Sequence, residues 1–382
     1  AADLFGEGLV VPPVRLVSRG RPVVEVWRIV AANSRTPDAR WSDLQAQLAA
    51  HRLGAARLAA IERTAPGTLR HVQALLDWSH GLAHARWAEL PHGTATFTDA
   101  LDTTAGDPPL AITATVRIDP SGLAVDFTGT AADVAVGLNA PLAVTRSAVL
   151  YAACCLLPDV PINDGLLATV RVTAPLGCLV HPRHPAPVAG GNVETSQRIV
   201  DAVFGALAAL GVPGIPAASQ GTMNNLLAGG RDAAGRPWAY YETMGGGGGA
   251  AEGRAGVSGL QVHMTNTRNT PIEALESALP IRVERYELRR GSGGAGRWSG
   301  GDGVVRRLRF LAPAEITLLT DRRRARPWGL AGGAPGAVGQ NRLWRGRRVV
   351  PLPGRVTRRV APGDVIEVRS PGGGGWGPPR EA

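Results

Sequence analysis

The stretch Gly190-Gly-Asn-Val-Glu-Thr-Ser-Gln-Arg198 joins a pair of glycines to the start of an apolar run that ends near Leu210. This pattern predicts a helix over residues 193–210, with Glu194 and Thr195 in its first turn. Helix N-termini expose unpaired backbone amides, so such a start can hold a carboxylate, a phosphate or an oxyanion. The alternative is that Glu194 only complements the helix dipole.

Three more polar runs follow, at residues 220–225, 240–250 and 263–273. Their Asn, Thr and Gln side chains donate and accept hydrogen bonds, Glu and His can move protons, and glycine lets backbone amides approach a ligand. The same residue types also build turns and helix caps. Because four such runs fall within one short part of the chain, we expect them to form the wall of a site for a small polar molecule.

The candidate site residues fall into two groups. We expect Glu194 or Glu242 to orient water, and His263, the histidine of these runs, to carry a proton. The expected substrate-binding side chains are Asn192, Thr195, Gln220, Thr222, Asn224, Asn225, Asn266 and Asn269. The identity of any metal stays open.

Further motifs lie on both sides of these runs. They occupy residues 8–16, 32–36, 139–146, 289–298, 321–324, 327–333 and 371–377. In this order, and together with the four runs, the motifs resemble the hydantoinase B/5-oxoprolinase family over essentially the whole chain.

The resemblance implies the B-type, hydrolytic subunit of an ATP-dependent enzyme that opens 5-oxoproline, a hydantoin or a related lactam. In that family an A-type partner binds ATP and activates the amide by phosphorylation before water attacks. The glycine run at residues 245–249 lacks the Gly-Lys-Ser/Thr of a phosphate loop. We therefore expect ATP on the partner subunit, within a hetero-oligomer. Two alternatives stay open: a subunit of a related ATP-dependent ketone carboxylase, and a non-catalytic scaffold.

Family members usually begin with a longer N-terminal region. That region holds an Asn-Asp-Pro-Tyr run and a His- and Asp-rich run, which resemble sets of metal ligands. Neither run occurs in this sequence, whose first residue is Ala1. The resemblance therefore implies the larger, C-terminal part of a family protein, incomplete alone, with any divalent metal held by the missing region.

Composition excludes several classes of partner. With 44% hydrophobic and 19% charged residues among 382, the chain has the composition of a compact protein of two domains. The formal charge of +10 comes from scattered Arg without Lys, and aromatic residues do not interleave with it, so we expect no nucleic acid. Three cysteines make neither a disulfide framework nor a zinc spacing, and no apolar stretch has the roughly 18 residues of a membrane span. We expect a cytoplasmic protein.

The expected fold class is α+β. A main domain over residues 1–282 would contain, in order, a helical hairpin at about 42–90, a β-hairpin within 94–127, a buried helix at 143–157 and a strand at 170–173. A capping box at Ser42 would open the first helix. Residues 283–382 would form a β-rich unit with many Arg and Gly residues.

Three smaller patterns remain. His80 and His84 are four residues apart and would face one side of a helix, but no third metal ligand follows nearby. The arginines at residues 322–324 are expected to be exposed, solvated charge. The five glycines at residues 245–249 predict either a mobile loop or a backbone that its neighbours approach closely.

Overall fold

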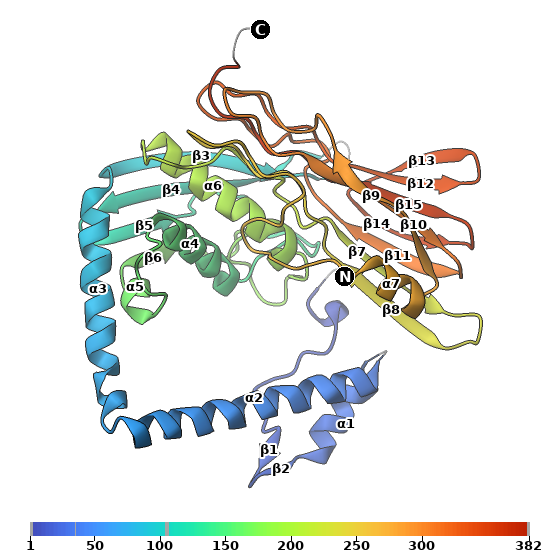
Figure 1. The fold of residues 1–382 in the computed structure, drawn as a ribbon, viewed down its shortest axis with the longest axis horizontal. Coiled ribbons are helices and arrows are strands. Elements are labelled where there is room, and N and C mark those ends of the chain that lie inside the picture. Colours follow the sequence, from blue (N-terminus) through green and yellow to red (C-terminus); the bar gives the residue numbers. More distant parts are fainter. Residues whose placement is uncertain (1–2, 35, 104–106, 380–382) are drawn as a thin grey trace.

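The computed structural model describes residues 3–34, 36–103 and 107–379. Figure 1 shows an α/β half, a β-rich half beside it, and an N-terminal arm that leaves the body. Helices and sheets both contribute substantially, so the expected α+β class is confirmed. No helix of the described residues is long and apolar enough to cross a membrane.

The α/β half is built on a four-stranded sheet in the order β3-β4-β5-β6, namely β3 (Gly93–Leu101), β4 (Leu110–Asp119), β5 (Gly122–Asp126) and β6 (Val170–Thr173). The expected β-hairpin is present, because β4 and β5 pair antiparallel across the turn before Gly122. Alternate residues of β4, from Ile112 to Ile118, are buried on one face. Strand β6 pairs parallel to β5, which requires the crossover that the next helices provide.

Helices α4 (Leu142–Leu156) and α6 (Ser196–Ala209) cover the apolar face of this sheet, and α6 packs on β3 and β4. One π turn over Gly191–Thr195 leads into α6, so the helix expected from residue 193 is confirmed. Every residue of α6 from Ser196 to Leu207 is buried. A helix buried on all sides fixes its polar side chains tightly, which makes it a suitable carrier for a site.

The β-rich half consists of two antiparallel sheets that enclose a second apolar core. The five-stranded sheet has the order β13-β12-β15-β10-β9, and its strands are β9 (Ile281–Arg289), β10 (Gly303–Phe310), β12 (Gln340–Arg345), β13 (Arg348–Leu352) and β15 (Val365–Arg369). The four-stranded sheet has the order β14-β11-β7-β8, and its strands are β7 (Asn225–Arg231), β8 (Pro237–Glu242), β11 (Ala314–Leu319) and β14 (Arg355–Val360). Strands β7 and β8 precede residue 283 yet belong to the same sheet as C-terminal strands, because β7 pairs with β11 and β8 pairs with β7. The division of the chain into two folding domains at that residue stays a prediction.

The N-terminal arm contains η1 (Phe5–Glu7), β1 (Val17–Ser18), β2 (Arg21–Pro22), α1 (Val24–Ala32) and the long helix α2 (Pro37–Thr64). After η2 (Thr68–His71), α3 (Val72–Glu89) returns to the sheet, where Ala83 and Trp87 are buried. Two short helices complete the fold: α5 (Asp164–Leu167), which packs against α3, and α7 (Ile272–Ala278), which packs against β9.

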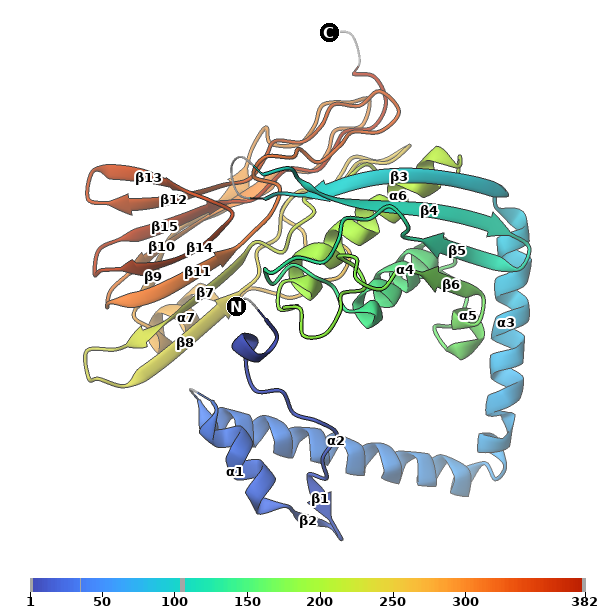
Figure 2. The same ribbon diagram turned by 180° about the vertical axis from the view of Figure 1, so that it is seen from behind.

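The helical hairpin expected at about 42–90 is wrong in its packing, although both helices exist. Figures 1 and 2 show α2 and α3 diverging from a corner instead of lying side by side. The buried face of α3 packs on the sheet, and the apolar residues Leu53, Leu58 and Ile61 of α2 are exposed. Helix α2 also begins at Pro37, so Ser42 lies inside it and donates to the Asp38 carbonyl instead of capping.

None of the 28 residues of α2 is buried, so tertiary packing adds little to its stability. We expect its amides to exchange with deuterium through local unfolding. Their exchange should be at least about a hundredfold faster than that of the amides of the buried helix α6. Hydrogen–deuterium exchange followed by mass spectrometry measures this difference. Equal protection of the two helices would contradict the exposure seen here.

Candidate active site

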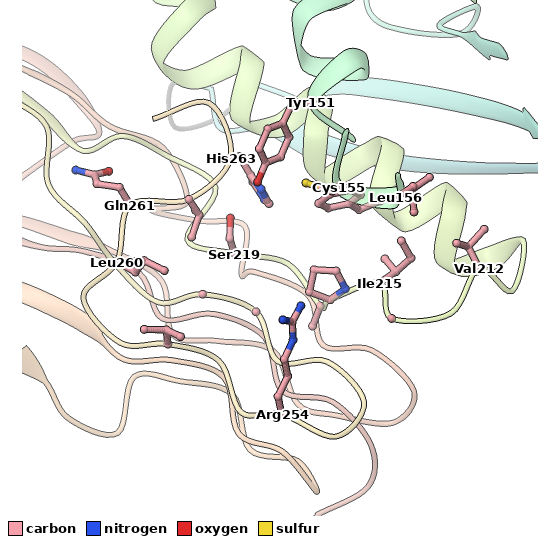
Figure 3. A pocket seen from close by; sticks show the side chains of 18 of the residues that line it. Tyr151, Cys155, Leu156, Val212, Ile215, Ser219, Arg254, Leu260, Gln261 and His263 are labelled. Atoms are coloured by element: carbon pink, nitrogen blue, oxygen red, sulfur yellow. The ribbon is translucent and has the colours of Figure 1, made fainter. Parts of the chain in front are cut away.

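A cavity of about 790 Å³ lies where α4 and α6 meet two loops, residues 212–219 and 248–266. Figure 3 shows its wall. Apolar side chains such as Leu156, Val212 and Ile215 form one part of it, and the polar side chains of Ser219 and His263 face another part. This volume lies within the range of roughly 300–1,000 Å³ typical of small-molecule sites.

His263 and Asp201 form the central pair of this site. The Nε2 atom of His263 lies 3.1 Å from Oδ1 of Asp201 on α6, and the Asp201 carboxylate is buried. The imidazole packs edge-on against the rings of Tyr151 and Phe204. His263 has a φ of 56°, a left-handed conformation that is strained for a residue with a side chain. The contacts with Asp201, Tyr151 and Phe204 therefore hold the imidazole ring in place. The Nδ1 atom of His263 has no hydrogen-bond partner among the described residues.

Two further titratable side chains, Tyr151 and Cys155, face the cavity beside His263 (Figure 3). Burial and the neighbouring Cys155 raise the pKa of the Tyr151 hydroxyl, and burial raises the pKa of the Cys155 thiol. Both groups are therefore protonated at neutral pH. The raised pKa also argues against Cys155 as a thiolate nucleophile. His263 is the cavity residue best suited to accept a proton.

Behind His263 lies a buried network of ion pairs. Asp201 binds Arg322 at 2.9 Å, Arg322 binds Asp99 on β3 at 2.7 Å, and Asp99 also accepts from Arg198 on α6 at 3.2 Å. Arg198 in turn binds Asp321 at 2.9 Å. Burial raises the pKa of Asp99, but the charges of Arg198 and Arg322 outweigh burial and lower it to about 2. The Asp99 carboxylate is therefore ionised at neutral pH, and Arg322 joins it to the Asp201 carboxylate that orients His263.

The expectation that the arginines at residues 322–324 are all exposed is wrong for Arg322, whose side chain is 1% exposed. Asp99 and Asp201 compensate its charge, so its burial does not leave an unpaired charge inside the protein. Arg323 is partly buried and donates to Asn224 at 2.9 Å. Arg324 is exposed as expected.

A second polar cluster surrounds Glu194, which is fully buried and does not line the cavity. Asn225 donates to it at 3.2 Å, and Tyr241 donates to Asn225 at 2.7 Å. Burial, and then the nearby charge of Asp321, raise the pKa of Glu194 well above that of an ordinary glutamate. Its role in orienting water stays a prediction.

Other predicted residues belong to this same buried cluster. Asn224 donates to Gln220 at 2.7 Å, and Thr222 accepts from the backbone amides of Asn224 and Asp321. Thr195 donates to the Leu138 carbonyl. These side chains bond to one another and to the backbone inside the protein, but the buried Nε2 of Gln220 and Oε2 of Glu194 have no hydrogen-bond partner among the described residues.

A third cluster contains Glu242 and Asn269. Glu242 accepts from Tyr240 at 2.8 Å and from Asn269 at 2.9 Å, and it forms an ion pair with Arg306 at 3.2 Å. This cluster also lies outside the cavity wall. Asn192 is exposed at the start of α6. Of the eleven predicted site residues, His263 and Asn266 line the cavity, while the others lie behind it or apart from it.

Sequence reasoning missed Tyr151 and Arg254 on the cavity wall, and Asp201 behind it. A usable signal existed for Asp201, because Glu194, Arg198 and Asp201 recur at helical spacing within an apolar helix. Charges on a helix that is otherwise apolar indicate buried partners. No comparable local signal marked Tyr151 or Arg254.

The described residues contain no group of three or more His, Cys, Asp or Glu side chains placed to hold a metal ion. His80 and His84 contact each other, with 3.1 Å between their Nε2 atoms. The second ring nitrogen of His84 bonds to the Pro120 carbonyl. The pair joins α3 to the turn between β4 and β5.

The fold and the cavity can be compared with known proteins. A model of the hydantoinase B/oxoprolinase family matches residues 1–379. The chain therefore belongs to the hydantoinase B/oxoprolinase family, which confirms the resemblance read from its motifs.

Individual relatives agree with this membership. An uncharacterized protein of Methanocaldococcus jannaschii is 37% identical over 99% of this chain and 66% of its own length. The 5-oxoprolinase 1 of Arabidopsis thaliana is 38% identical over 88% of this chain and 27% of its own length. A Pseudomonas protein named as the B-type subunit of a D-/L-hydantoinase is 32% identical over 100% of this chain and 67% of its own. The chain thus spans about two thirds of these relatives or less.

Two solved structures share the fold. The ATP-dependent caprolactamase of Pseudomonas jessenii superposes with a TM-score of 0.86 and 25% identity, over 98% of this chain and 67% of its own. Acetone carboxylase in its nucleotide-free state gives a TM-score of 0.85 and 16% identity, over 98% of this chain and 57% of its own. At 16% identity the second likeness shows the fold alone.

The Asp99→Asn substitution tests the ion network. It leaves Arg198 and Arg322 with one carboxylate fewer, and removing one partner of a buried pair costs about 3–5 kcal/mol. We expect a corresponding loss in the free energy of unfolding measured by urea denaturation. Asp43→Asn is the matched control, because the Arg40–Asp43 pair is half-exposed and contributes about 1 kcal/mol at most. Equal losses in both variants would show that the network adds no special stability.

The raised pKa of Glu194 predicts a pH effect on stability. Above the ordinary glutamate pKa of about 4.3, the unfolded chain releases this proton while the folded protein retains it. Native stability therefore falls with rising pH, by at most about 1.4 kcal/mol per pH unit from this group. In Glu194→Gln this contribution is absent, so the variant should gain stability relative to the native protein between pH 5 and 8.

Thermal unfolding across that pH range measures the effect. Glu252→Gln is the control, because Glu252 is exposed and its replacement should leave the pH profile unchanged. A pH profile of Glu194→Gln parallel to the native one would refute the raised pKa.

Proposed function

We propose that this chain forms part of the hydrolytic component of an ATP-dependent enzyme that opens a small cyclic amide. The observation that carries the proposal is the His263–Asp201 pair on the wall of a cavity of about 790 Å³. Membership in the hydantoinase B/oxoprolinase family supports it. The likeness to an ATP-dependent caprolactamase at 25% identity also supports it.

The cavity suits the chemistry of amide hydrolysis. Resonance makes an amide carbonyl a poor electrophile, and transfer of a phosphoryl group from ATP to the amide oxygen makes the carbonyl carbon more electrophilic. Water then adds to this carbon, the C–N bond breaks as the ring nitrogen takes up a proton, and the acyl phosphate that forms is hydrolysed to a carboxylate and phosphate. His263 accepts the proton of the attacking water at Nδ1, since Asp201 occupies Nε2 and stabilises the imidazolium. The Ser219 hydroxyl and the Asn266 amide hydrogen-bond the polar edge of the ring, and the apolar wall contacts its methylene groups.

The glycine run does not fit a phosphate-binding loop, which supports the proposal that a partner subunit binds ATP. In the glycine run the amides of Gly247, Gly248 and Ala250 donate to carbonyl groups elsewhere in the protein at 2.8–3.0 Å. Amides engaged in this way cannot cradle a phosphate. An A-type ATP-binding subunit, as the family resemblance implies, would complete a hetero-oligomer in the cytoplasm. The free cysteines fit a reducing compartment.

The chain covers about two thirds of its relatives or less, so the activity proposed belongs to the assembled enzyme. The family region expected to hold a divalent metal would also have to join that assembly. Metal analysis of the chain with and without such a companion separates an enzyme from a non-catalytic scaffold. The ketone carboxylase alternative requires bicarbonate, so ATP turnover that depends on bicarbonate would replace amide hydrolysis as the proposal.

Replacement of His263 by Ala tests the proton-transfer role. Positioned acid–base groups contribute about 10²- to 10⁴-fold to the rate, so we expect kcat to fall by that factor with little change in KM. Turnover of a cyclic amide by the enzyme assembled with its ATP-binding partner measures the effect. His51→Ala, an exposed substitution on α2, should leave kcat unchanged. Normal turnover in His263→Ala would exclude this role.

A further inference from the structure

The N-terminal arm exposes a large share of the apolar side chains on the surface. Among the described residues, half of the large hydrophobic residues that are exposed lie within residues 9–82, a fifth of the chain. Single hydrophobic residues scattered over a surface are ordinary, whereas a concentration of them marks a surface that another molecule covers. The arm is therefore a candidate interface.

The densest group lies at the corner where α2, η2 and α3 meet (Figures 1 and 2). Its six members, named here the corner patch, are Leu58, Ile61, Leu69, Val72, Leu75 and Trp78. Each of them is between 44% and 57% exposed. Water therefore contacts about half of every side chain in the patch, although all six belong to residue types that favour burial.

Hydrogen bonds hold the corner in a fixed shape. The Glu62 carboxylate accepts from the amides of Gly67 at 2.7 Å and Leu69 at 3.2 Å. These two bonds lower the pKa of Glu62, so the carboxylate is ionised at neutral pH. Gly67 has a φ of 87°, a conformation that glycine adopts without strain. The chain thus sets the direction in which α3 leaves α2 without packing the two helices together.

Helix α3 has two apolar sides. The side with Ser79, Ala83 and Trp87 is buried against the body. Leu75 and Trp78 lie three residues apart on another side of the helix, where both are exposed. A helix with two apolar sides packs between two surfaces. The described residues supply one of these surfaces, so the second comes from elsewhere.

Positive charge surrounds the corner patch. The exposed arginines between residues 44 and 76 are Arg52, Arg57, Arg63 and Arg70. Glu62 is the one acid in the same range, and its carboxylate is bound by backbone amides. A complementary surface has apolar side chains at its centre and carboxylates at its rim.

The lengths of the relatives indicate what covers the patch. This chain matches 66% of the Methanocaldococcus jannaschii protein and 67% of the Pseudomonas hydantoinase subunit. The caprolactamase shares the fold over 67% of its own chain. Each of these proteins therefore has about a third of its length outside the shared part. That third is on the order of 200 residues, the size of one domain.

We propose that the corner patch is the docking surface for this further domain of the family-length protein. The domain covers the apolar side chains of α2, η2 and α3, and its carboxylates pair with the arginines around them. Docking supplies the tertiary packing that α2 lacks in this chain. The proposal is independent of the proposed function, since it concerns the assembly of the fold and not the chemistry of the cavity.

Hydrogen–deuterium exchange of the intact Methanocaldococcus jannaschii protein tests the proposal, because that protein contains the shared part and the further third. In each protein, the exchange rate of the segment equivalent to residues 53–72 is divided by that of the segment equivalent to α6. This ratio corrects for differences in overall stability. We expect the ratio to be at least about tenfold smaller in the relative than in this chain. Equal ratios would overturn the proposal.

Substitutions show whether the protection comes from the corner patch. In this chain, Ile61→Glu and Leu75→Glu should leave the unfolding temperature unchanged, because both side chains are exposed and Glu favours helices. Glutamate at the two equivalent positions of the relative should restore fast exchange, because it places charge in a buried apolar contact. The control is Leu311→Glu and its equivalent, since Leu311 is 50% exposed between β10 and β11 and lies outside the patch. Protection that survives both patch substitutions contradicts the assignment of the surface.

Two other occupants give different results. A dimer of the relative in analytical ultracentrifugation that the substitution equivalent to Ile61→Glu dissociates, with corner protection that falls on dilution, assigns the patch to a second copy. Binding of the relative to vesicles of phosphatidylserine and phosphatidylcholine that the same substitution abolishes assigns it to a membrane surface. Either result overturns the proposal and leaves the proposed function standing.

Discussion

The buried ion network around Asp99, Arg198, Asp201, Asp321 and Arg322 is the constraint on which the rest of the structure depends. These residues come from β3, from α6 and from the segment after β11, so they belong to both halves of the molecule. Moving any one of these charges out of water without its partners costs several kcal/mol. The two halves therefore reach their native arrangement together. The same network positions Asp201, and through it His263.

Glycine provides the second constraint, because it lets loops of the two halves pack backbone against backbone. A Cβ atom on Gly249 would lie 1.8 Å from the Ala217 carbonyl oxygen, and one on Gly373 would lie 2.0 Å from the Gly248 carbonyl oxygen. Of the two interpretations of the run at 245–249, the structure supports close approach, since its amides are engaged in backbone hydrogen bonds. Gly248 and Gly249 of this run also line the cavity.

Sequence periodicity predicted the elements of the fold well. The alternation in β4, the apolar run of α4 and the glycine-led start of α6 were each found where local chemistry placed them. The packing of α2 was not predictable. An apolar stripe indicates that one face of a helix favours burial, but it does not indicate which surface of the protein covers that face. The polar runs that suggested one site in fact divide between a cavity wall and two buried clusters. Asn, Thr and Glu have the same hydrogen-bonding chemistry in both settings, so only tertiary contacts distinguish them.

The arm connects to the body through few contacts, which separates its stability from that of the site. Near the N-terminus the Glu7 carboxylate accepts from the amides of Val188 and Ala189 at 2.8 Å, and at the other end Trp87 of α3 is buried beneath the sheet. Between these anchors, Trp27 is the one buried hydrophobic residue among the described residues from 9 to 82. A displacement of the arm therefore leaves both apolar cores intact. The segment that Glu7 binds lies directly before Gly190 and leads into the turn that carries Glu194, so this end of the arm is tied to the buried Glu194 cluster and not to the cavity wall.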